Sequence, residues 1–544
     1  MAINQQAFLQ TIVVFSLTML KIPQSNTRFH DKLLVFLGII GVLTISLVYG
    51  SPQNNQKKVL IIGAGPSGLV AAKSALECGL VPTVLEQGNA LGGAWHPQAG
   101  LMWQSMQTNI SRYNAMFSDF QWPLHTPDFP NNRDMYTYLK DYAAHFKLTE
   151  HIHLNSPVMR VKQHHSMWQV TWKETGKTRK QKFDFVIVAS GMFSKPYLPS
   201  LPGMDQFKGQ IVHSKNYKHP ALFKNKRVVI VGGMFSGSQI ATDICPIASQ
   251  VTNVISRPAY VLKRYIQANP NSAQIPIDLV RYAREEKAQK EKITLQNQNL
   301  IDHAFFGKLC QEQGQICQAL TMKPSADKPA YVTISDTYLS AIQTGKIQVT
   351  LNKIARLDEK GIVFQNGAQQ AIDAIIFCTG YELALPFFDA KIQDILSFEP
   401  KDRLQPILLH KNVFHPQLPN LAFVGIYRGT YWGVMELQAR WASMVFGGLL
   451  EPPALETMIK GINCELDIRK QQPKPQFPHN SYIELMEALA HELGVAPELA
   501  YIQANDPQLY QMLIKGPIVP AHYRLSGFAK APKVAKKIIQ ELHE

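Results

Sequence analysis

Short apolar runs followed at once by glycine-rich turns occur twice in the chain and divide it into two similar halves. Each turn leads into a stretch of helix-compatible composition, and a second short apolar run follows that stretch. The segments are residues 57–62, 63–68, 69–77 and 82–85 in the first half, and residues 227–231, 232–237, 238–244 and 251–255 in the second. Buried strands that alternate with helices predict parallel sheets, so the pattern indicates an α/β fold.

The first turn has the spacing of a dinucleotide-binding loop. Gly63 permits the tight turn, Gly65 lets the backbone approach a pyrophosphate, and Gly68 allows the helix to pack closely on the strand. The pyrophosphate would lie at the helix N-terminus, where free N–H groups favour an anion. Glu86 follows the second strand and can bind ribose hydroxyls. We therefore expect a Rossmann-like unit whose dinucleotide contacts Gly63, Gly65, Pro66, Ser67, Gly68 and Glu86.

The second turn departs from this spacing at one position. Met234 stands where the middle glycine is expected, and its side chain would crowd the backbone approach to a pyrophosphate. The next strand is followed by a hydroxyl and a guanidinium instead of an acid, and this pair suits a 2′-phosphate. The sequence therefore favours NADPH over NADH, held by Gly232, Ser236, Gly237, Ser256 and Arg257. A fold-support unit that has lost its coenzyme is the alternative.

Each half also ends in a similar strand. Residues 184–191 (DFVIVASG) and 373–380 (DAIIFCTG) both place an acid six residues before a Ser-Gly or Thr-Gly pair. This repeat suggests that the second Rossmann-like unit is inserted into the first, with these strands as the crossings. A nicotinamide needs a hydride acceptor, so the other dinucleotide should be a flavin. The predicted organisation is an extension at 1–56, a first unit at 57–220 and 341–465, an inserted unit at 221–340, and a C-terminal helical segment at 466–544.

Residues 33–49 are apolar and carry no charge, unlike the rest of the chain. As a helix these 17 residues would span about 26 Å, at the short end of what crosses a bilayer. Basic residues flank the run on both sides, so the positive-inside rule gives no orientation. We expect an N-terminal hydrophobic helix that anchors the chain in a membrane; a signal peptide and an interfacial segment are the alternatives.

Composition and charge exclude several classes of protein. The chain has 544 residues, 46% of them hydrophobic and 17% charged, which supports a sizeable core and excludes global disorder. The net charge of +15 favours anionic partners, but the basic residues are scattered and no nucleic-acid motif accompanies them, so we expect no nucleic-acid binding. Six cysteines without a CxxC pair support neither a disulfide framework nor a zinc ribbon, and no metal site is expected.

Residues 207–217 (FKGQIVHSKNY) fit the pattern FxGxxxHxxx[FY], the signature of flavin-containing monooxygenases. The chain resembles this family from about residue 57 to 541. Further agreement comes from residues 92–95, 108–109, 117–120, 377–381, 413–416, 421–425, 436–441, 516–517 and 523–525.

The resemblance implies FAD in the outer unit and NADPH in the inserted one. NADPH would reduce the flavin, and a C4a-hydroperoxyflavin would then pass one oxygen atom from O2 to a nucleophilic nitrogen or sulfur of a small molecule. By the same resemblance, Asn109 would face flavin C4a and the nicotinamide, where its amide can both donate and accept. The other residues implied to contact FAD are Ala94, Trp95, Thr108 and Gln438. The signature residues Phe207, Gly209, His213 and Tyr217 would form either a hinge between the units or a coenzyme contact.

The expected protein is a membrane-associated monooxygenase whose catalytic part faces the cytoplasm, where NADPH is available. A Baeyer–Villiger oxygenase is the nearest alternative, but its related signature usually ends in Trp where this chain has Tyr217. An NADPH oxidase that releases hydrogen peroxide is a third reading, which Met234 would encourage. A flavin-bearing membrane protein without turnover is the non-enzymatic alternative. Self-association into a homo-oligomer is compatible with the sequence, which does not name the substrate.

Overall fold

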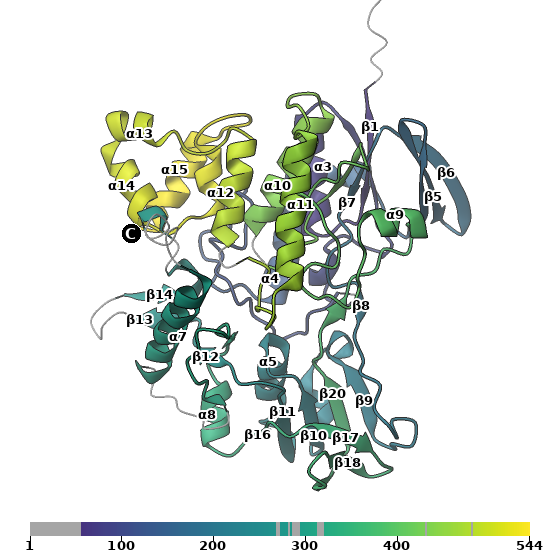
Figure 1. The fold of residues 1–544 in the computed structure, drawn as a ribbon, viewed down its shortest axis with the longest axis vertical. Coiled ribbons are helices and arrows are strands. Elements are labelled where there is room, and N and C mark those ends of the chain that lie inside the picture. Colours follow the sequence, from purple (N-terminus) through teal and green to yellow (C-terminus); the bar gives the residue numbers. More distant parts are fainter. Residues whose placement is uncertain are drawn as a thin grey trace, which may run out of the picture. The chain divides into compact units, whose positions relative to one another are not determined.

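The chain divides into two units, residues 1–56 and 57–544, and every element below belongs to the second (Figure 1). The predicted N-terminal helix at 33–49 lies outside the described residues. In the part of the chain that is described, no helix is long and apolar enough to cross a bilayer. This computed structural model describes residues 56–98, 100–267, 273–280, 283–285, 294–312, 320–429, 432–479 and 482–543.

The first sheet follows the predicted order of strand, turn, helix and strand. β1 (Lys58–Ile62) leads into the first glycine turn, α3 (Pro66–Glu77) follows, and β2 (Val81–Leu85) runs parallel to β1. The sheet order is β22-β7-β1-β2-β3, and all neighbours are parallel. The remaining strands are β3 (Ile152–His153), β7 (Phe185–Val188) and β22 (Leu421–Phe423).

The second sheet repeats this arrangement. β10 (Arg227–Val231), α5 (Phe235–Ile244) and β11 (Gln250–Val254) correspond to β1, α3 and β2. The order is β16-β11-β10-β20-β9, again with parallel neighbours throughout. The other strands are β9 (Gln210–His213), β16 (Gln348–Thr350) and β20 (Ala374–Phe377). The α/β prediction with parallel sheets is therefore confirmed.

The two repeated acids have the same structural role. Asp184 Oδ2 accepts a hydrogen bond of 2.8 Å from the backbone N–H of Lys58, the first residue of β1. Asp373 Oδ2 accepts one of 2.8 Å from the backbone N–H of Arg227, the first residue of β10. Each acid thus holds the start of the central strand of its own sheet, which accounts for the internal repeat.

The second sheet extends beyond the predicted boundaries of the inserted unit. β9 lies before residue 221, and β16 and β20 lie after residue 340. The sheet therefore runs from residue 210 to 377, and only β22 returns to the first sheet. β9 has only four residues and lies within the signature at 207–217. Its partner, β20, lies more than 150 positions later in the chain, so no local pattern marks β9 as a strand of the second sheet.

Antiparallel segments fill the connections between the parallel strands. A three-stranded meander precedes β7 and another precedes β20, and the two crossings between the sheets pair with each other as β8 and β21. These strands are β4 (Val158–His164), β5 (Met167–Glu174), β6 (Lys177–Phe183), β8 (Lys195–Pro196), β17 (Ile354–Leu357), β18 (Gly361–Phe364), β19 (Gln369–Ala371) and β21 (Tyr381–Glu382). Two further pairs are β12 (Tyr260–Leu262) with β15 (Val332–Ile334) and β13 (Tyr265–Gln267) with β14 (Gln274–Pro276).

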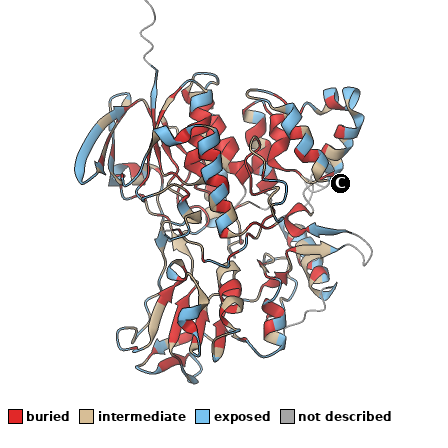
Figure 2. Ribbon diagram, turned by 180° about the vertical axis from the view of Figure 1, so that it is seen from behind, coloured by how far each residue is buried: buried red, intermediate tan, exposed pale blue. Residues whose placement is uncertain are grey.

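The largest core lies where helices cover the first sheet. α10 (Trp432–Phe446) packs against α3 and against α12 (Tyr482–Glu492), and nearly all of its residues are buried. Figure 2 shows that buried residues gather in the sheets and in the helices that cover them. The other helices are α4 (Asn132–His145), α7 (Leu295–Glu312), α8 (Tyr338–Gln343), α9 (Ala390–Ile395), α11 (Leu455–Lys470), α13 (Leu499–Asn505), α14 (Pro507–Lys515) and α15 (Pro532–Glu541).

Candidate functional site

The first glycine turn accommodates no side chain at two of its positions. Gly63 has φ +105°, and a Cβ there would lie 2.7 Å from Ala189 O. A Cβ on Gly68 would collide with Gly63 O, so α3 can lie against the turn only with glycine there. No side chain caps the N-terminus of α3, which leaves its first N–H groups for an anionic ligand.

The second glycine turn has the same geometry. Gly232 has φ +120°, and a Cβ there would lie 2.5 Å from Cys378 O. A Cβ on Gly237 would collide with Gly232 O, and the N-terminus of α5 also lacks a side-chain cap. Ser236, in the first turn of α5, is half-buried. Both turns therefore fit the phosphates of a dinucleotide.

Met234 takes the position of Gly65 without backbone strain. Both residues are the N-cap of their helix, with extended backbones of φ −90°, ψ −168° for Met234 and φ −76°, ψ −174° for Gly65. The neighbouring Gly233 packs on Ile255, directly after β11, because a Cβ there would lie 2.5 Å from Ile255 Cγ2. The turn therefore cannot move toward β11 to make room for the methionine side chain, and crowding of the pyrophosphate stays a prediction.

Glu86 is fixed at the end of β2. Its carboxylate accepts hydrogen bonds from the backbone N–H groups of Ala64 (2.8 Å) and Gly88 (2.7 Å), and the residue is buried. A carboxylate has about four acceptor positions, so capacity for ribose hydroxyls remains. The acid is thus held beside the first turn, as ribose binding requires.

The segment 92–95 lies directly on the first turn. Gly92 N–H donates to Ala64 O at 2.9 Å, and a Cβ on Gly93 would lie 2.9 Å from Gly65 Cα. Ala94 and Trp95 continue this segment as a short 3-10 turn and are half-buried. Two glycine loops therefore meet where the first dinucleotide is expected.

Gln438 is completely buried in α10 and shapes the same region from the other side. Its Oε1 accepts a hydrogen bond of 3.0 Å from Gly425 N–H. A Cβ on Gly425 would collide with the Ser67 hydroxyl in the first turn of α3. Gln438 therefore supports the loop beside the first turn, and its direct contact with flavin stays a prediction.

Asn109 belongs to the first unit and contacts the helix that follows the second glycine turn. Its Oδ1 accepts a hydrogen bond of 2.6 Å from Gln239 Nε2, on α5 of the second unit. The preceding Thr108 is buried, and its hydroxyl has no hydrogen-bond partner among the described residues. A buried hydroxyl without a partner is costly, so it fits a site that a polar ligand completes.

Residues of the inserted region hold the loop that carries Asn109. Arg264 Nε donates to Thr108 O at 3.0 Å, and Arg264 Nη1 pairs with Asp336 at 2.7 Å. Asp278 Oδ2 accepts from the N–H of Ser111 at 2.9 Å, and burial raises the pKa of Asp278. Sequence analysis missed Gln239, Arg264 and Asp278 as site residues, because no local motif marks contacts between segments more than a hundred residues apart.

The signature residues lie at the crossing between the sheets. His213 is buried; its Nδ1 accepts from Lys215 N–H at 3.1 Å, so Nε2 carries the proton and donates to Gly380 O at 3.1 Å. Burial lowers the pKa of His213, which favours this neutral form. Tyr217 is buried and its hydroxyl donates to Asp243 on α5.

The other two signature residues pack together. A Cβ on Gly209 would collide with the ring of Phe207 and would lie 2.6 Å from Asp373 O. The contacts of all four signature residues place them at the crossing between the sheets, and both the hinge role and the coenzyme contact stay predictions.

Ser256 and Arg257 are exposed at the end of β11. The Arg257 guanidinium carbon lies 3.8 Å from the centre of the Tyr331 ring. This stacking holds the guanidinium at the carboxyl end of a parallel strand, where dinucleotides bind in such sheets. Arg257 is thus exposed at the edge where a coenzyme is expected, and its contact with a 2′-phosphate stays a prediction.

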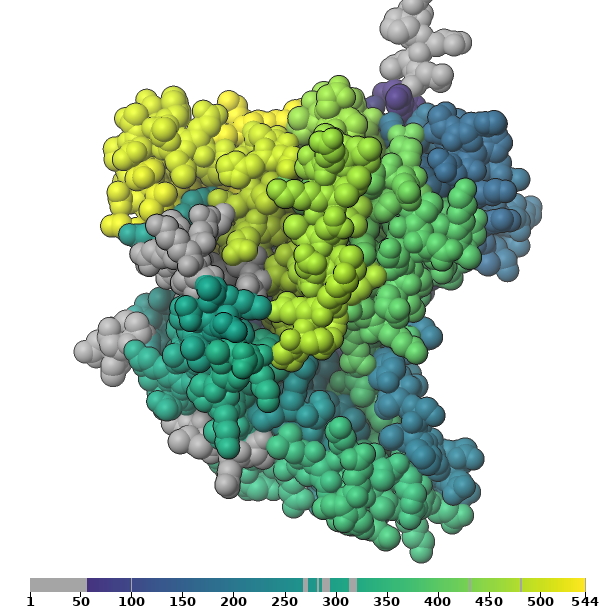
Figure 3. All heavy atoms as spheres, in the orientation of Figure 1, coloured from purple at the N-terminus to yellow at the C-terminus, as the bar shows by residue number. Residues whose placement is uncertain are grey.

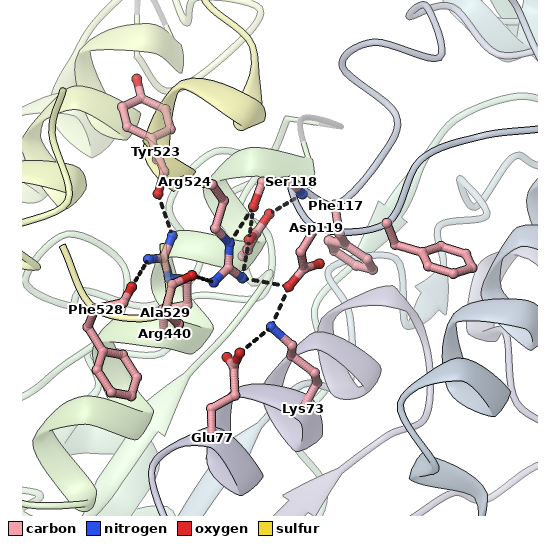
Figure 4. A network of polar contacts seen from close by, with 12 residues as sticks. Lys73, Glu77, Phe117, Ser118, Asp119, Arg440, Tyr523, Arg524, Phe528 and Ala529 are labelled. Carbon is pink, nitrogen blue, oxygen red and sulfur yellow. Dashed lines mark hydrogen bonds and ion pairs between the residues drawn. The ribbon is translucent and has the colours of Figure 1, made fainter. Parts of the chain in front are cut away.

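Three of the motifs listed for the resemblance meet in one buried ionic network (Figure 4). Arg524 Nη2 pairs with Glu436 Oε1 at 2.9 Å and with Asp119 Oδ2 at 2.7 Å, and Arg524 Nε donates to Ser118 Oγ at 2.8 Å. Lys73 of α3 also pairs with Asp119. Burial opposes ionisation of Asp119, but Arg524 and Lys73 outweigh it and lower its pKa. The network joins α3, α10 and the C-terminal segment.

Comparison with known proteins agrees with two dinucleotide sites. Residues 56–543 match the family described as Flavin-binding monooxygenase-like. Flavin-containing monooxygenase 5 of Oryctolagus cuniculus is 32% identical over 513 residues, which cover 89% of this chain and 91% of that protein.

Two solved structures share the fold at lower identity. S-allyl-L-cysteine S-oxygenase from Allium sativum has a TM-score of 0.59 and 22% identity, covering 84% of this chain and 95% of that one. Cyclohexanone monooxygenase from Rhodococcus sp. Phi1 bound to NADP+ has a TM-score of 0.60 and 16% identity, covering 84% of this chain and 99% of that one.

Proposed function

Because the chain belongs to the flavin-binding monooxygenase-like family, we propose that it forms a C4a-hydroperoxyflavin and oxygenates a nucleophilic nitrogen or sulfur of a small molecule. The chain is a flavin-containing monooxygenase-type enzyme that uses FAD and NADPH. The observation that carries the proposal is the hydrogen bond between Asn109 Oδ1 and Gln239 Nε2, which joins the two dinucleotide units.

The residues of the chain bind, orient and shield the reacting groups. When bound, the flavin accepts a hydride from NADPH and activates dioxygen. The N–H groups at the start of α3 bind the FAD pyrophosphate and Glu86 binds its ribose. With Oδ1 held by Gln239, the Asn109 NH2 group is left to donate toward the reacting oxygen without adding charge.

Packing around the site supports exclusion of water. Arg524 and Glu436 are almost completely buried, and their network ties α10 and the C-terminal segment to the loop after Asn109. A dry, fixed environment slows loss of activated oxygen as hydrogen peroxide. This shielding distinguishes an oxygenase from an oxidase.

The signature, and not the fold, favours nitrogen or sulfur over a carbonyl substrate. A sulfur-oxygenating enzyme shares the fold, although a carbonyl-oxygenating type does so too, so the fold alone does not decide. Tyr217 ends the signature where the carbonyl-oxidising relatives usually carry Trp, and its hydroxyl is committed to Asp243.

We also propose that the N-terminal segment attaches the enzyme to a membrane, with the catalytic unit on the cytoplasmic side. The support is the uncharged apolar run 33–49 and the requirement for NADPH. Carbonate extraction of the full chain tests attachment, and protease accessibility of a C-terminal tag tests sidedness. Release by carbonate, or a tag protected by intact membranes, contradicts the corresponding half of this proposal.

The oxygenation proposal is tested with three probe substrates. The full-length holoenzyme is given NADPH and methyl phenyl sulfide, N,N-dimethylaniline or cyclohexanone, and NADPH, hydrogen peroxide and product are quantified. We expect sulfoxide or N-oxide in near equivalence to NADPH, and little lactone. Lactone as the main product indicates carbonyl oxygenation, and peroxide as the only product indicates an oxidase; either result contradicts the proposal.

A further inference from the structure

Three arginines from separate segments gather at the carboxyl edge of the second sheet. Arg257 follows β11. Arg403 lies before β22, where the chain returns to the first sheet, and Arg428 lies between β22 and α10. Arg428 Nη1 donates to Arg403 O at 3.4 Å. A Cβ on Gly380, just after β20, would lie 3.8 Å from Arg403 Nη1. We call the three guanidiniums the arginine cluster. Since β11 and β20 are the two neighbours of β10, the cluster has members on both sides of the strand that leads into the second glycine turn.

No carboxylate within the described residues forms an ion pair with the arginine cluster. Asp402 is the nearest acid in sequence, but its oxygens are committed elsewhere. Its Oδ1 accepts from the N–H groups of Leu404 (2.9 Å) and Gln405 (2.8 Å), and its Oδ2 pairs with Lys474 Nζ at 2.7 Å. Among the described residues the three cations thus have no ion-pair partner, and Asp402 attracts Arg428 less than Arg403 and Arg257 repel it. This arrangement indicates a site for an anionic ligand.

A frame of aromatic and ionic contacts holds the arginine cluster in place. Arg257 stacks on Tyr331, whose hydroxyl donates to Lys474 O at 2.6 Å, and Lys474 in turn pairs with Asp402. Arg403 stacks on Tyr197, with its guanidinium carbon 4.7 Å from the ring centre. In Figure 3 the segment after α11 reaches the teal surface of the inserted region, where these contacts lie. Guanidiniums positioned in this way lose little further freedom on binding a ligand.

The electrostatics of Arg428 agree with this arrangement. Burial, and then the charges of Arg403 and Arg257, lower its pKa to about 10. Arg428 therefore stays protonated at neutral pH, although its neighbours repel its charge. An anion between the three groups would relieve that repulsion.

We propose that Arg403 and Arg428 bind the pyrophosphate of NADPH, while Arg257 binds its 2′-phosphate. A dinucleotide lies with its pyrophosphate over the turn after the central strand, which here is β10. The Met234 side chain is expected to crowd the backbone approach at that turn, and two guanidiniums from the opposite side would supply the lost attraction. The proposal rests on NADPH as the coenzyme and is independent of which atom the enzyme oxygenates.

The test separates the two phosphate groups by the choice of probe. Isothermal titration calorimetry on the full-length FAD-loaded enzyme measures binding of NADP+, of NAD+ and of adenosine 2′-monophosphate, which lacks a pyrophosphate. Arg403→Gln and Arg428→Gln should each weaken NADP+ and NAD+ by the same factor, about tenfold or more, and leave the monophosphate unchanged. Arg257→Gln should weaken NADP+ and the monophosphate and spare NAD+. The matched control is Arg356→Gln, because this exposed arginine pairs with Asp358 at 3.9 Å outside the cluster, and it should change none of the three affinities.

Several outcomes would overturn the proposal. Unchanged NADP+ and NAD+ affinity in both folded variants removes the arginine cluster from coenzyme binding, and a higher KM for substrate alone reassigns it to an anionic substrate. Loss of bound FAD assigns Arg428 to the other dinucleotide. If Arg428→Gln does not fold, the exposed Arg403→Gln and the conservative Arg428→Lys still decide the question. A failure to form N-oxide or sulfoxide leaves these binding measurements interpretable, so the two proposals fail separately.

Discussion

Gln239 Nε2 donates a hydrogen bond of 2.6 Å to Asn109 Oδ1, across a junction that joins the two dinucleotide-binding units. Gln239 lies on the helix that begins at the second glycine turn, and Asn109 lies in the loop that connects segment 92–95 to α4 in the first unit. With its oxygen held by Gln239, the Asn109 amide has one orientation, and its NH2 group is directed to the remaining side. The orientation of the Asn109 amide therefore depends on both dinucleotide-binding units.

Gln239→Leu should therefore uncouple NADPH oxidation from oxygenation. Leucine has a similar size but cannot hold the Asn109 amide, so hydrogen peroxide formed per NADPH should rise several-fold while FAD content stays constant. A peroxide assay beside NADPH absorbance measures this ratio. The exposed Gln365→Leu serves as the control, and an unchanged ratio in Gln239→Leu contradicts an orienting role.

Asn109→Asp should give the same phenotype by a direct route. An ionised carboxylate cannot donate a hydrogen bond, so FAD should remain bound while activated oxygen is lost faster as peroxide. The double variant with Gln239→Leu should be little worse than Asn109→Asp alone, because both changes remove one function. Fully additive losses would mean that the two residues act separately.

Met234→Gly should tighten NADPH binding a few-fold. Glycine restores the backbone approach at the N-cap of α5, which already has an extended conformation that glycine adopts freely. Stopped-flow reduction of the flavin at varied NADPH gives the Kd. Gly233→Met is the matched contrast, because a side chain there meets Ile255 and should destabilise the fold. An unchanged Kd in Met234→Gly would show that the methionine does not crowd the coenzyme.

The glycine turns were predictable because their requirements are local. A Cβ at Gly68 or Gly237 collides with the carbonyl oxygen of the glycine five residues earlier, so the motif carries the geometry with it. The repeated acids were visible because each stands directly before an apolar strand in the same local pattern, although the strand start that each acid holds lies 126 or 146 positions away.

Long-range contacts were not predictable in this way. Arg264 reaches Thr108 O from 156 positions away, and neither segment has a pattern that names the other. The extent of the second sheet was not predictable because β9 is short and pairs with a strand far along the chain. The signature residues are recognisable in sequence. Only the structure shows that His213 is neutral and that both of its ring nitrogens form hydrogen bonds at the crossing between the sheets.

Arg524→Met should destabilise the protein by about 3–5 kcal/mol, because it leaves Glu436 buried without its cation and Asp119 with Lys73 alone. Urea unfolding followed by circular dichroism measures the free energy of unfolding. Arg179→Met, which breaks an exposed pair with Glu174, should cost at most about 1 kcal/mol. A loss below about 1 kcal/mol in Arg524→Met would contradict the structural role of the network.

His410 should make the protein less stable in mild acid. It is buried, and neither ring nitrogen has a hydrogen-bond partner among the described residues. Burial, then Lys411, lowers its pKa to about 4 from the usual 6.5. The unfolded chain therefore binds the proton more readily, and the free energy of unfolding should fall as pH drops from about 6.5 to 4, by up to about 1.4 kcal/mol per pH unit.

His410→Leu removes this titration and should flatten the dependence of unfolding free energy on pH over that range. The exposed His125→Leu is the control and should leave the slope as it is. Urea unfolding at pH 7, 6, 5 and 4 provides the comparison. Equal slopes for His410→Leu and the unmodified chain would contradict the assignment of the acid sensitivity to His410.

The most direct test of the central claim is the fate of labelled oxygen. The full-length holoenzyme is incubated with NADPH, methyl phenyl sulfide and 18O2, and the product is analysed by mass spectrometry against NADPH consumed. Oxygenation by this enzyme predicts one 18O atom in each sulfoxide and close to one sulfoxide for each NADPH. Sulfoxide without the label, or NADPH consumed with hydrogen peroxide as the only oxygen-derived product, would contradict it.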